Sequence, residues 1–375
     1  MSNFCSDAKF KKKLLKINSI NFFLDYFKCS SLRNSFTFAP YIMGPTLKTI
    51  EYFLPKKILT NEDLAKEFGK DSQNIFKNTG ILKRHIRNKK QIGSDLGFQA
   101  AKKLLKKNPN YLSKIDFLIF CSEGLDYKAP TTASVIHYRL GLNQNCGCID
   151  MPMGCAGYVY GLSLAKSMIL SNDVSCILFI AADIPSSVIH SEDFNLRSLF
   201  GDAGTATIIE NSESGKIGNF VFGNDGSGAK NLCVERGSTR APLDKEYLEL
   251  HKKQVGNLAH GRMTMNGMEI TRFSLEKVPL LLNETLKKNK LTFDEIDLFV
   301  FHQASIIILD SLKRKCKIPD SKFYVYLEAV GNTVSCTIPI ALFNAEKENR
   351  LKRGDVVMLI GFGVGYSWGG TILHY

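Results

Sequence analysis

Cys155 is the residue whose type and position most directly suggest chemistry. It lies in the stretch Asp150-Met-Pro-Met-Gly-Cys-Ala-Gly-Tyr158, after an apolar run at 146–149 that is typical of a buried strand. The small and apolar residues that follow have helical spacing, so we expect Cys155 at or near the N-terminus of a helix. Backbone N–H groups and the helix dipole stabilise a thiolate at such a position, and the thiolate is the nucleophilic form of cysteine.

Two polar residues in the C-terminal half could act with Cys155. His302 follows a strand-like apolar run, and Asn332 lies between a glycine and a threonine. Taken one at a time, all three residues have a simpler interpretation. Cys155 could be a buried structural cysteine, His302 a hydrogen-bonded core histidine, and Asn332 a residue of a turn or a helix start. Together they predict a site for nucleophilic catalysis by cysteine, which is intrinsically a strong side-chain nucleophile.

The motifs around these residues resemble those of the type III beta-ketoacyl-ACP synthases, which are condensing enzymes of the thiolase-like class. The matching motifs occur in the family's order and at similar separations: Cys155-Ala-Gly157, His302-Gln-Ala-Ser305, Gly331-Asn-Thr333 and Gly361-Phe-Gly-Val-Gly-Tyr-Ser-Trp368. The resemblance covers about Tyr41–Tyr375, and the set of motifs is far more specific than any one of them.

The resemblance implies a decarboxylative Claisen condensation of an acyl thioester with malonyl-ACP. Cys155 would carry the acyl group, and His302 Nε2 and Asn332 Nδ2 would donate hydrogen bonds to the enolate. The backbone N–H groups of Cys155 and Val364 would form the oxyanion hole, although the family usually has glycine at position 364. An acyl-CoA or acyl-ACP donor, malonyl-ACP, acyl carrier protein and a second copy in a homodimer are the implied partners, without a cofactor or metal.

Several positions depart from the family pattern at the donor-binding end. Asn74 and Asn78 stand where a tryptophan and an arginine usually hold the adenine of CoA, which argues against tight CoA binding unless the basic stretch Lys83–Arg87 replaces them. Ile307 replaces an arginine that contacts the carrier protein. A basic cluster farther along the same predicted helix could still bind an acidic carrier, and it consists of Lys313, Arg314 and Lys315.

Two further positions concern the acyl group. Ala129 stands where well-known members have a phenylalanine that limits the acyl pocket from across the dimer, so we expect a longer or bulkier acyl chain. Glu123 follows a predicted strand and could point into the site, but we interpret it as a loop residue.

An internal repeat predicts the fold without any reference to a family. The run Lys114-Ile-Asp-Phe-Leu-Ile-Phe-Cys-Ser-Glu123 parallels Glu295-Ile-Asp-Leu-Phe-Val-Phe-His-Gln-Ala304, and the two aspartates are 181 residues apart. Each run follows a lysine-rich amphipathic helix. Alternating strands and helices indicate mostly parallel, covered sheets. We therefore expect an α/β protein with a duplicated, thiolase-like, five-layered α-β-α-β-α fold.

The repeat also predicts the division of the chain. Residues 1–40 would be an N-terminal extension, poorly ordered or packed on the surface. Residues 41–215 would be a first half that carries the nucleophilic cysteine, and residues 216–375 a second half that carries the histidine and asparagine.

Composition limits the classes of function. The 375 residues are 44% hydrophobic, and no apolar run approaches the roughly 20 residues of a membrane helix. The net charge of +13 would suit nucleic acid, but the lysines are dispersed and no nucleic-acid motif is present. Ten scattered cysteines without C-x-x-C pairs indicate a reducing cytoplasm rather than a disulfide framework.

The sequence leaves two other functions open. The same Cys155 and His302 could transfer an acyl group to an alcohol or amine without decarboxylation. Alternatively, the chain could be a non-catalytic subunit of a condensing-enzyme pair, although such a subunit need not keep all three polar groups. The donor, the acceptor and the pathway are not determined by the sequence.

Overall fold

A five-stranded sheet forms the first half of the part of the chain that this computed structural model describes, which is residues 44–213, 215–251 and 261–375. Its strand order is β1 (Gly44–Phe53), β7 (Ala203–Ser212), β6 (Cys176–Asp183), β4 (Phe117–Cys121) and β5 (Gly147–Met151). The strands β5, β4 and β6 are parallel, whereas β7 runs antiparallel to both β6 and β1. The sequence predicted a mostly parallel sheet, but only β5, β4 and β6 are parallel neighbours, because β7 is antiparallel to the strands on both of its sides.

A second sheet repeats the same arrangement. Its order is β13 (Phe323–Tyr324), β12 (Leu298–Phe301), β14 (Val356–Gly363), β15 (Ser367–His374) and β8 (Lys216–Ile217), and β9 (Val221–Asn224) also pairs with β15. As in the first sheet, three neighbouring strands are parallel and the fourth is antiparallel to the third. The duplication predicted from the sequence is therefore confirmed strand by strand.

The two repeated aspartates do the same structural work in the two halves. Asp116 precedes β4 and accepts hydrogen bonds from the backbone N–H groups of Ser175 (2.7 Å) and Cys176 (3.1 Å), where β6 begins. Asp297 precedes β12 and accepts one from Val356 N–H at 2.8 Å, where β14 begins. Each carboxylate thus joins the starts of two adjacent parallel strands, which explains why the Ile-Asp pair recurs.

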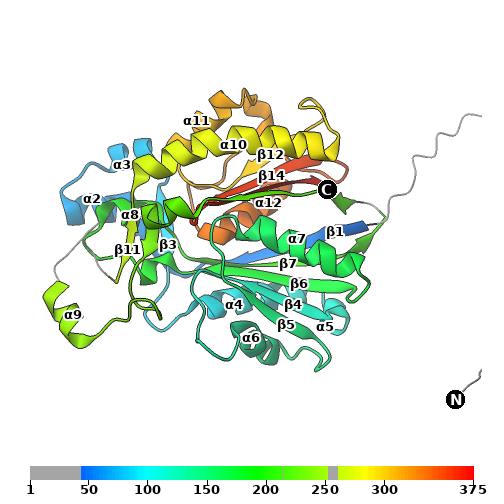
Figure 1. Cartoon of the computed structure of the whole chain (residues 1–375), viewed down its shortest axis with the longest axis horizontal. Helices are drawn as coiled ribbons and strands as arrows, with labels where there is room; N and C mark the ends of the chain where they lie inside the picture. The colour runs from blue at the N-terminus through cyan, green and yellow to red at the C-terminus, as the bar shows by residue number, and fades with distance from the viewer. Residues whose placement is uncertain (1–43, 214, 252–260) are drawn as a thin grey trace, which may run out of the picture. The chain divides into compact units, whose positions relative to one another are not determined.

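Helices separate and cover the two sheets (Figure 1). The helices α7 (Gly157–Leu170) and α12 (Thr337–Lys347) contact strands of both sheets and form the central layer. On the outer faces, α4 (Gly93–Lys107) and α6 (Thr132–Leu140) pack on the first sheet, and α10 (Gly267–Asn289) packs on the second beside α11 (Ile306–Lys315). This is the expected five-layered α-β-α-β-α architecture. Helix α7 is apolar nearly all round, as a helix between two sheets must be.

Smaller elements complete the chain. They are β2 (Lys57–Thr60), α2 (Asn61–Phe68), α3 (Ser72–Thr79), β3 (Lys83–Ile86), α5 (Tyr111–Lys114), α8 (Phe194–Leu199), β10 (Leu232–Val234), α9 (Lys245–His251) and β11 (Met263–Met265), together with short 3-10 turns. None of the described helices has both the length and the apolar character to cross a membrane. The extension predicted for residues 1–40 lies outside the described residues.

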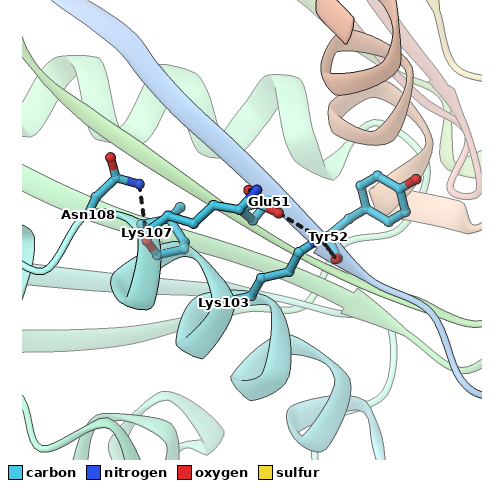
Figure 2. A network of polar contacts seen from close by, with 6 residues as sticks. Glu51, Tyr52, Lys103, Lys107 and Asn108 are labelled. Carbon is cyan, nitrogen blue, oxygen red and sulfur yellow. Dashed lines mark hydrogen bonds and ion pairs between the residues drawn. The ribbon is translucent and has the colours of Figure 1, made fainter.

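An ion-pair cluster fastens α4 to the first sheet (Figure 2). Glu51 on β1 has a side chain that is only 3% exposed, and both Lys103 (2.8 Å) and Lys107 pair with its carboxylate. The two lysines come from successive turns of α4 and remain about half exposed. Their long side chains carry the ammonium groups from the helix to the buried acid, and Lys103 Nζ also lies 5.5 Å from the centre of the Tyr52 ring on β1.

Candidate active site

Cys155 lies where the first sheet meets the central layer. The chain leaves β5 at Met151, turns at Gly154, and enters α7 at Gly157, so Cys155 precedes the helix by two residues. Its side chain is 4% exposed. The strand before it differs from the expectation, because β5 is an edge strand of its sheet and is only half-buried.

His302 follows β12 directly, and contacts with two other residues fix the orientation of its ring. Its Nδ1 lies 2.7 Å from the hydroxyl oxygen of Thr337, and its ring meets Phe362 edge-on with centroids 5.5 Å apart. The side chain is 2% exposed. Because Nδ1 has a protein partner, Nε2 is the ring nitrogen left for a ligand. The sequence did not indicate the part that Thr337 plays.

Asn332 has a side-chain amide whose orientation is set by two backbone groups. Its Oδ1 accepts a hydrogen bond from Val334 N–H at 3.0 Å, and its Nδ2 donates to the carbonyl of Ala304 at 3.3 Å. The Nδ2 group has two hydrogens, so one remains for a ligand.

The three predicted residues line one cavity of about 180 Å³. Cys155 comes from the first half of the chain, whereas His302 and Asn332 come from the second. The rest of the wall is largely apolar and includes Phe200, Ile308 and Phe362. The structure therefore brings together the three polar groups that the sequence singled out, in a site that excludes most water.

The turn after β14 places two backbone N–H groups near the nucleophile. The amides of Val364 and of Cys155 itself both favour the thiolate of Cys155. Gly363 permits this approach, because a Cβ at position 363 would lie only 2.8 Å from Cys155 Sγ. The two amides suggested for an oxyanion hole are thus adjacent to the sulfur.

The expectation of a stabilised thiolate is nevertheless wrong. Burial is the main cause that raises the pKa of Cys155 above its usual value, and the negative charge of Glu123 raises it further. Burial also lowers the pKa of His302 to about 3, so its imidazole is neutral and supplies no positive charge. The helix-terminus argument failed because it neglected the cost of placing an anion in an apolar cavity.

A second, larger cavity of about 570 Å³ lies beside the nucleophile. It is lined by Glu123, Gly154 and Val364, together with the apolar Met153 and Leu232 and several polar groups. Glu123 follows β4, as predicted, but its carboxylate faces this cavity and is therefore part of the site. A Cβ at Gly154 would lie within 1.8 Å of Glu123 Oε1, so the carboxyl group rests directly against the backbone next to Cys155.

A surface groove of about 470 Å³ adjoins the smaller cavity, and both are lined by Leu199 and Ser305. Asn74 and Asn78 line this groove. Phe194 on α8 lines it too, with Lys70 Nζ 5.8 Å from the centre of its ring. Sequence reasoning missed this aromatic face, since Phe194 is far along the chain from both asparagines.

Two of the three basic residues in the stretch Lys83–Arg87, which the sequence offered as a replacement for the missing CoA contacts, are bound within the protein. Arg84 is fully buried and donates to the carbonyl of Ser198 and the side chain of Asn61. The guanidinium of Arg87 is bound by nearby backbone carbonyls, including that of Gln91 at 2.6 Å. Of the three basic residues, only Lys83 has an exposed side chain.

The predicted carrier-docking cluster lies at the C-terminal end of α11, whose first turn borders the smaller cavity. Arg314 and Lys315 are exposed. Lys313 is paired with Asp320 at 2.7 Å and Asp310 at 3.4 Å, so less of its charge is available to a partner. Ala129 lies on an exposed loop and lines neither cavity of its own chain; its predicted place in a partner's pocket stays a prediction.

Comparison with known proteins agrees with this geometry. Residues 149–226 match the family model described as 3-Oxoacyl-[acyl-carrier-protein (ACP)] synthase III, and residues 286–375 match its C-terminal counterpart. The chain is 32% identical to the beta-ketoacyl-[acyl-carrier-protein] synthase III of Syntrophomonas wolfei over 86% of this chain and 95% of that protein. It is 34% identical to that of Campylobacter concisus, over 88% and 96% of the two chains.

Solved structures give the same result. A crystal structure of a 3-oxoacyl-(acyl-carrier-protein) synthase III matches with a TM-score of 0.84 and 37% identity, covering 88% of this chain and all of that one. The enzyme from Thermus thermophilus matches with a TM-score of 0.79 and 29% identity, covering 88% and 99%.

The duplicated fold, with a cysteine at the start of a central helix that faces a histidine and an asparagine, defines a condensing enzyme of the thiolase-like class. Within that class, the long matches above 30% identity decide the family. The chain belongs to the beta-ketoacyl-[acyl-carrier-protein] synthase III family.

Proposed function

We propose that this chain condenses an acyl thioester with malonyl-ACP, with loss of CO₂, through an acyl group carried on Cys155. The observation that carries the proposal is the single apolar cavity that contains Cys155, His302 and Asn332. Family membership supports the same reaction and makes the chain an acyltransferase of the condensing type.

In the first half-reaction, the Cys155 sulfur attacks the donor's thioester carbonyl. The carbonyl oxygen becomes an oxyanion that accepts hydrogen bonds from the N–H groups of Cys155 and Val364. The thiol proton passes through the imidazole of His302 to the leaving thiolate. Burial keeps this imidazole neutral, so one of its nitrogens has a lone pair that can relay the proton without a lasting positive charge. The products are acyl-Cys155 and a free carrier thiol.

In the second half-reaction, the carboxylate of malonyl-ACP leaves as CO₂, and its bonding electrons form an enolate. His302 Nε2 and the free Nδ2 hydrogen of Asn332 stabilise the enolate oxygen. The enolate carbon attacks the acyl carbonyl, and collapse of the tetrahedral intermediate expels the Cys155 thiolate, which takes up a proton from solvent to restore the thiol. The product is a 3-oxoacyl-ACP, one two-carbon unit longer than the acyl donor.

The same proposal includes a homodimer. In the described part of the first sheet, β5 is an unpaired edge that carries Ile149 at 41% exposure. Tyr138 on the neighbouring α6 is 85% exposed, and Leu125 and Tyr127 are also exposed. An open strand edge with large apolar side chains around it is suited to pairing with a second copy. Analytical ultracentrifugation of the wild type and of Tyr138→Glu would test this part separately.

The division into halves at residue 215 is likewise a proposal. The first sheet uses strands up to Ser212, and the second uses strands from Lys216 onward, so the two sheets support a boundary between them. The functional consequence is a site built at the junction of two halves, neither of which has all the required groups.

Intact-mass spectrometry tests the proposed function directly. Wild-type protein incubated with acyl donors should gain one acyl group on the peptide that contains Cys155, and Cys155→Ser should gain none. Adding malonyl-ACP should remove the acyl group and yield CO₂ and 3-oxoacyl-ACP. Acyl groups on Cys121 or Cys336 would refute the assignment, and release only to alcohols or amines would favour a non-decarboxylating transferase.

A further inference from the structure

Glu123 places an acid beside the nucleophile, in a different cavity from the one that His302 and Asn332 line. Its carboxyl group touches the backbone at Gly154, one residue before Cys155, and it lines the larger cavity with Val364. The residue is held in place by its own backbone, because Glu123 N–H donates to Asp183 at 2.8 Å. Asp183 is buried and is itself bound by Ser122 and Ser335. The position of this acid is thus built into the fold.

The carboxyl group of Glu123 has no partner of its own in the described chain. Among the residues that the structure describes, none donates a hydrogen bond to it, and no lysine or arginine lines the cavity. The residue as a whole is exposed to the open cavity, but burial of its carboxyl group against the protein raises the pKa to about 8, and the negative charge of Asp183 raises it further. Near pH 7 the group is therefore mostly a neutral carboxylic acid, which can both donate and accept a hydrogen bond.

The chemistry of the proposed function assigns the two cavities to different parts of the substrates. The malonyl thioester must reach His302 and Asn332, so the smaller cavity receives the carrier arm. Cys155 itself lines the smaller cavity, but Gly154 and Val364 beside it line the larger one, so an acyl group on Cys155 that extends past them would enter the larger cavity. Its first few carbons would lie beside Glu123.

A plain alkyl chain in that position would displace water from the Glu123 carboxyl group without offering a hydrogen bond to replace it. A buried polar group without a partner is costly, whereas a paired one is not. We infer that Glu123 selects acyl donors that carry a hydroxyl or another uncharged hydrogen-bonding group within a few carbons of the thioester. The inference rests on the proposed function and specifies its donor class.

A matched pair of donors on one carrier provides the test. The rate at which Cys155 is acylated is measured by intact mass at pH 7 with butyryl and 3-hydroxybutyryl thioesters of the same carrier. Wild-type protein should load the hydroxylated donor about tenfold faster or more, since a site built around a polar group discriminates strongly against an analogue without one. A succinyl donor should load slowly, and still more slowly above pH 8, where Glu123 becomes ionised.

Two variants separate selection from general damage. Glu123→Leu should reverse the preference, because the butyryl chain then meets an apolar wall, whereas Glu123→Gln should keep a preference for the hydroxyl. Glu62→Leu, at an exposed position on α2, serves as a matched control and should behave like the wild type. Circular dichroism and thermal melts establish that each variant is folded.

Three outcomes would overturn the inference. The first is equal or faster loading of butyryl by the wild type, and the second is a preference that Glu123→Leu leaves unchanged. The third is an equal loss for every donor in Glu123→Gln, which would make Glu123 a general base instead. In all three, Cys155 still becomes acylated, so the proposed function survives. If no donor acylates Cys155, the proposed function itself fails.

Discussion

The Nδ1 atom of His302 lies 2.7 Å from the hydroxyl oxygen of Thr337, the first residue of α12. In the structure this hydroxyl donates to the carbonyl of Val334 at 3.1 Å, so its oxygen accepts from Nδ1–H and Nε2 is free to take up the thiol proton. The enolate step requires the other tautomer. Thr337 must then turn its hydroxyl to donate to Nδ1, so that Nε2 carries the hydrogen that an enolate requires.

We therefore predict that Thr337→Val slows malonyl decarboxylation by about tenfold or more, because one correctly oriented donor is lost. Acylation of Cys155 should fall less, since that step needs Nε2 only as a proton acceptor. Thr337→Ser keeps the hydroxyl and should retain most of the activity. Release of ¹⁴CO₂ from labelled malonyl-ACP measures the effect, and a wild-type rate in the valine variant would contradict it.

His302 and Asn332 should divide the work of the two half-reactions. Asn332→Ala removes an enolate donor and should lower decarboxylation by on the order of 10²-fold, while Cys155 still becomes acylated. His302→Ala should impair both steps, because this residue also passes the thiol proton. Single-turnover loading and CO₂ release, measured on the same samples, distinguish the two patterns. Equal effects of both variants on loading would be incompatible with this division.

The alkylation of Cys155 should depend on the charge of Glu123. Burial is the largest cause of the raised pKa of Cys155, and ionised Glu123 raises this pKa further. Because the pKa of Glu123 is about 8, its charge appears as the pH rises through that value and then opposes formation of the thiolate. Glu123→Gln should consequently react faster with iodoacetamide between pH 8 and 10, with little change at pH 6. A slower reaction in that range would argue against the electrostatic coupling.

The groove beside the smaller cavity should bind the nucleotide of CoA only weakly. Asn74 and Asn78 provide neither a stacking ring nor a cation, which leaves Phe194 as the aromatic face and Lys70 as the nearby charge. We expect acyl-ACP donors to load Cys155 faster than acetyl-CoA. Phe194→Ala should raise KM for CoA donors and leave KM for ACP donors nearly unchanged. A clear preference of the wild type for acetyl-CoA would contradict this expectation.

The cluster around Glu51 should respond asymmetrically to mutation (Figure 2). In Lys103→Gln/Lys107→Gln the buried carboxylate loses both cations, which should cost about 3 kcal/mol of unfolding free energy or more. In Glu51→Gln the half-exposed lysines return to water, so the loss should be about 1 kcal/mol. Urea denaturation measures both, and equal losses would mean that burial of the acid is not what matters.

The sequence patterns predicted the duplicated fold and the residues of the candidate site, because both depend on strand order and motif spacing. The recurring Asp116 and Asp297 indicated the duplication, and the motifs around Cys155, His302 and Asn332 indicated the site. What escaped prediction depends on which way side chains point after distant segments pack.

Glu123 was interpreted as a loop residue because nothing local shows that its loop faces Cys155. Thr337 and Phe194 were missed for the same reason, since each acts on a residue that is far away in the sequence. The pKa of Cys155 was misjudged because the position at a helix start is visible in the sequence, whereas the depth of burial is not.

The spacing of 181 residues that relates the two aspartates also relates Cys155 to Cys336 and His302 to Cys121. The counterparts, Cys336 and Cys121, form no second site in the described part of the chain. Both thiols are fully buried; Cys336 donates to the carbonyl of Ala181, and Cys121 donates to that of Met153. The molecule therefore has one copy of this twofold feature at the candidate active site and the other copy in the core. Its symmetry is broken where a substrate must enter, so each chain should carry one acyl group and never two.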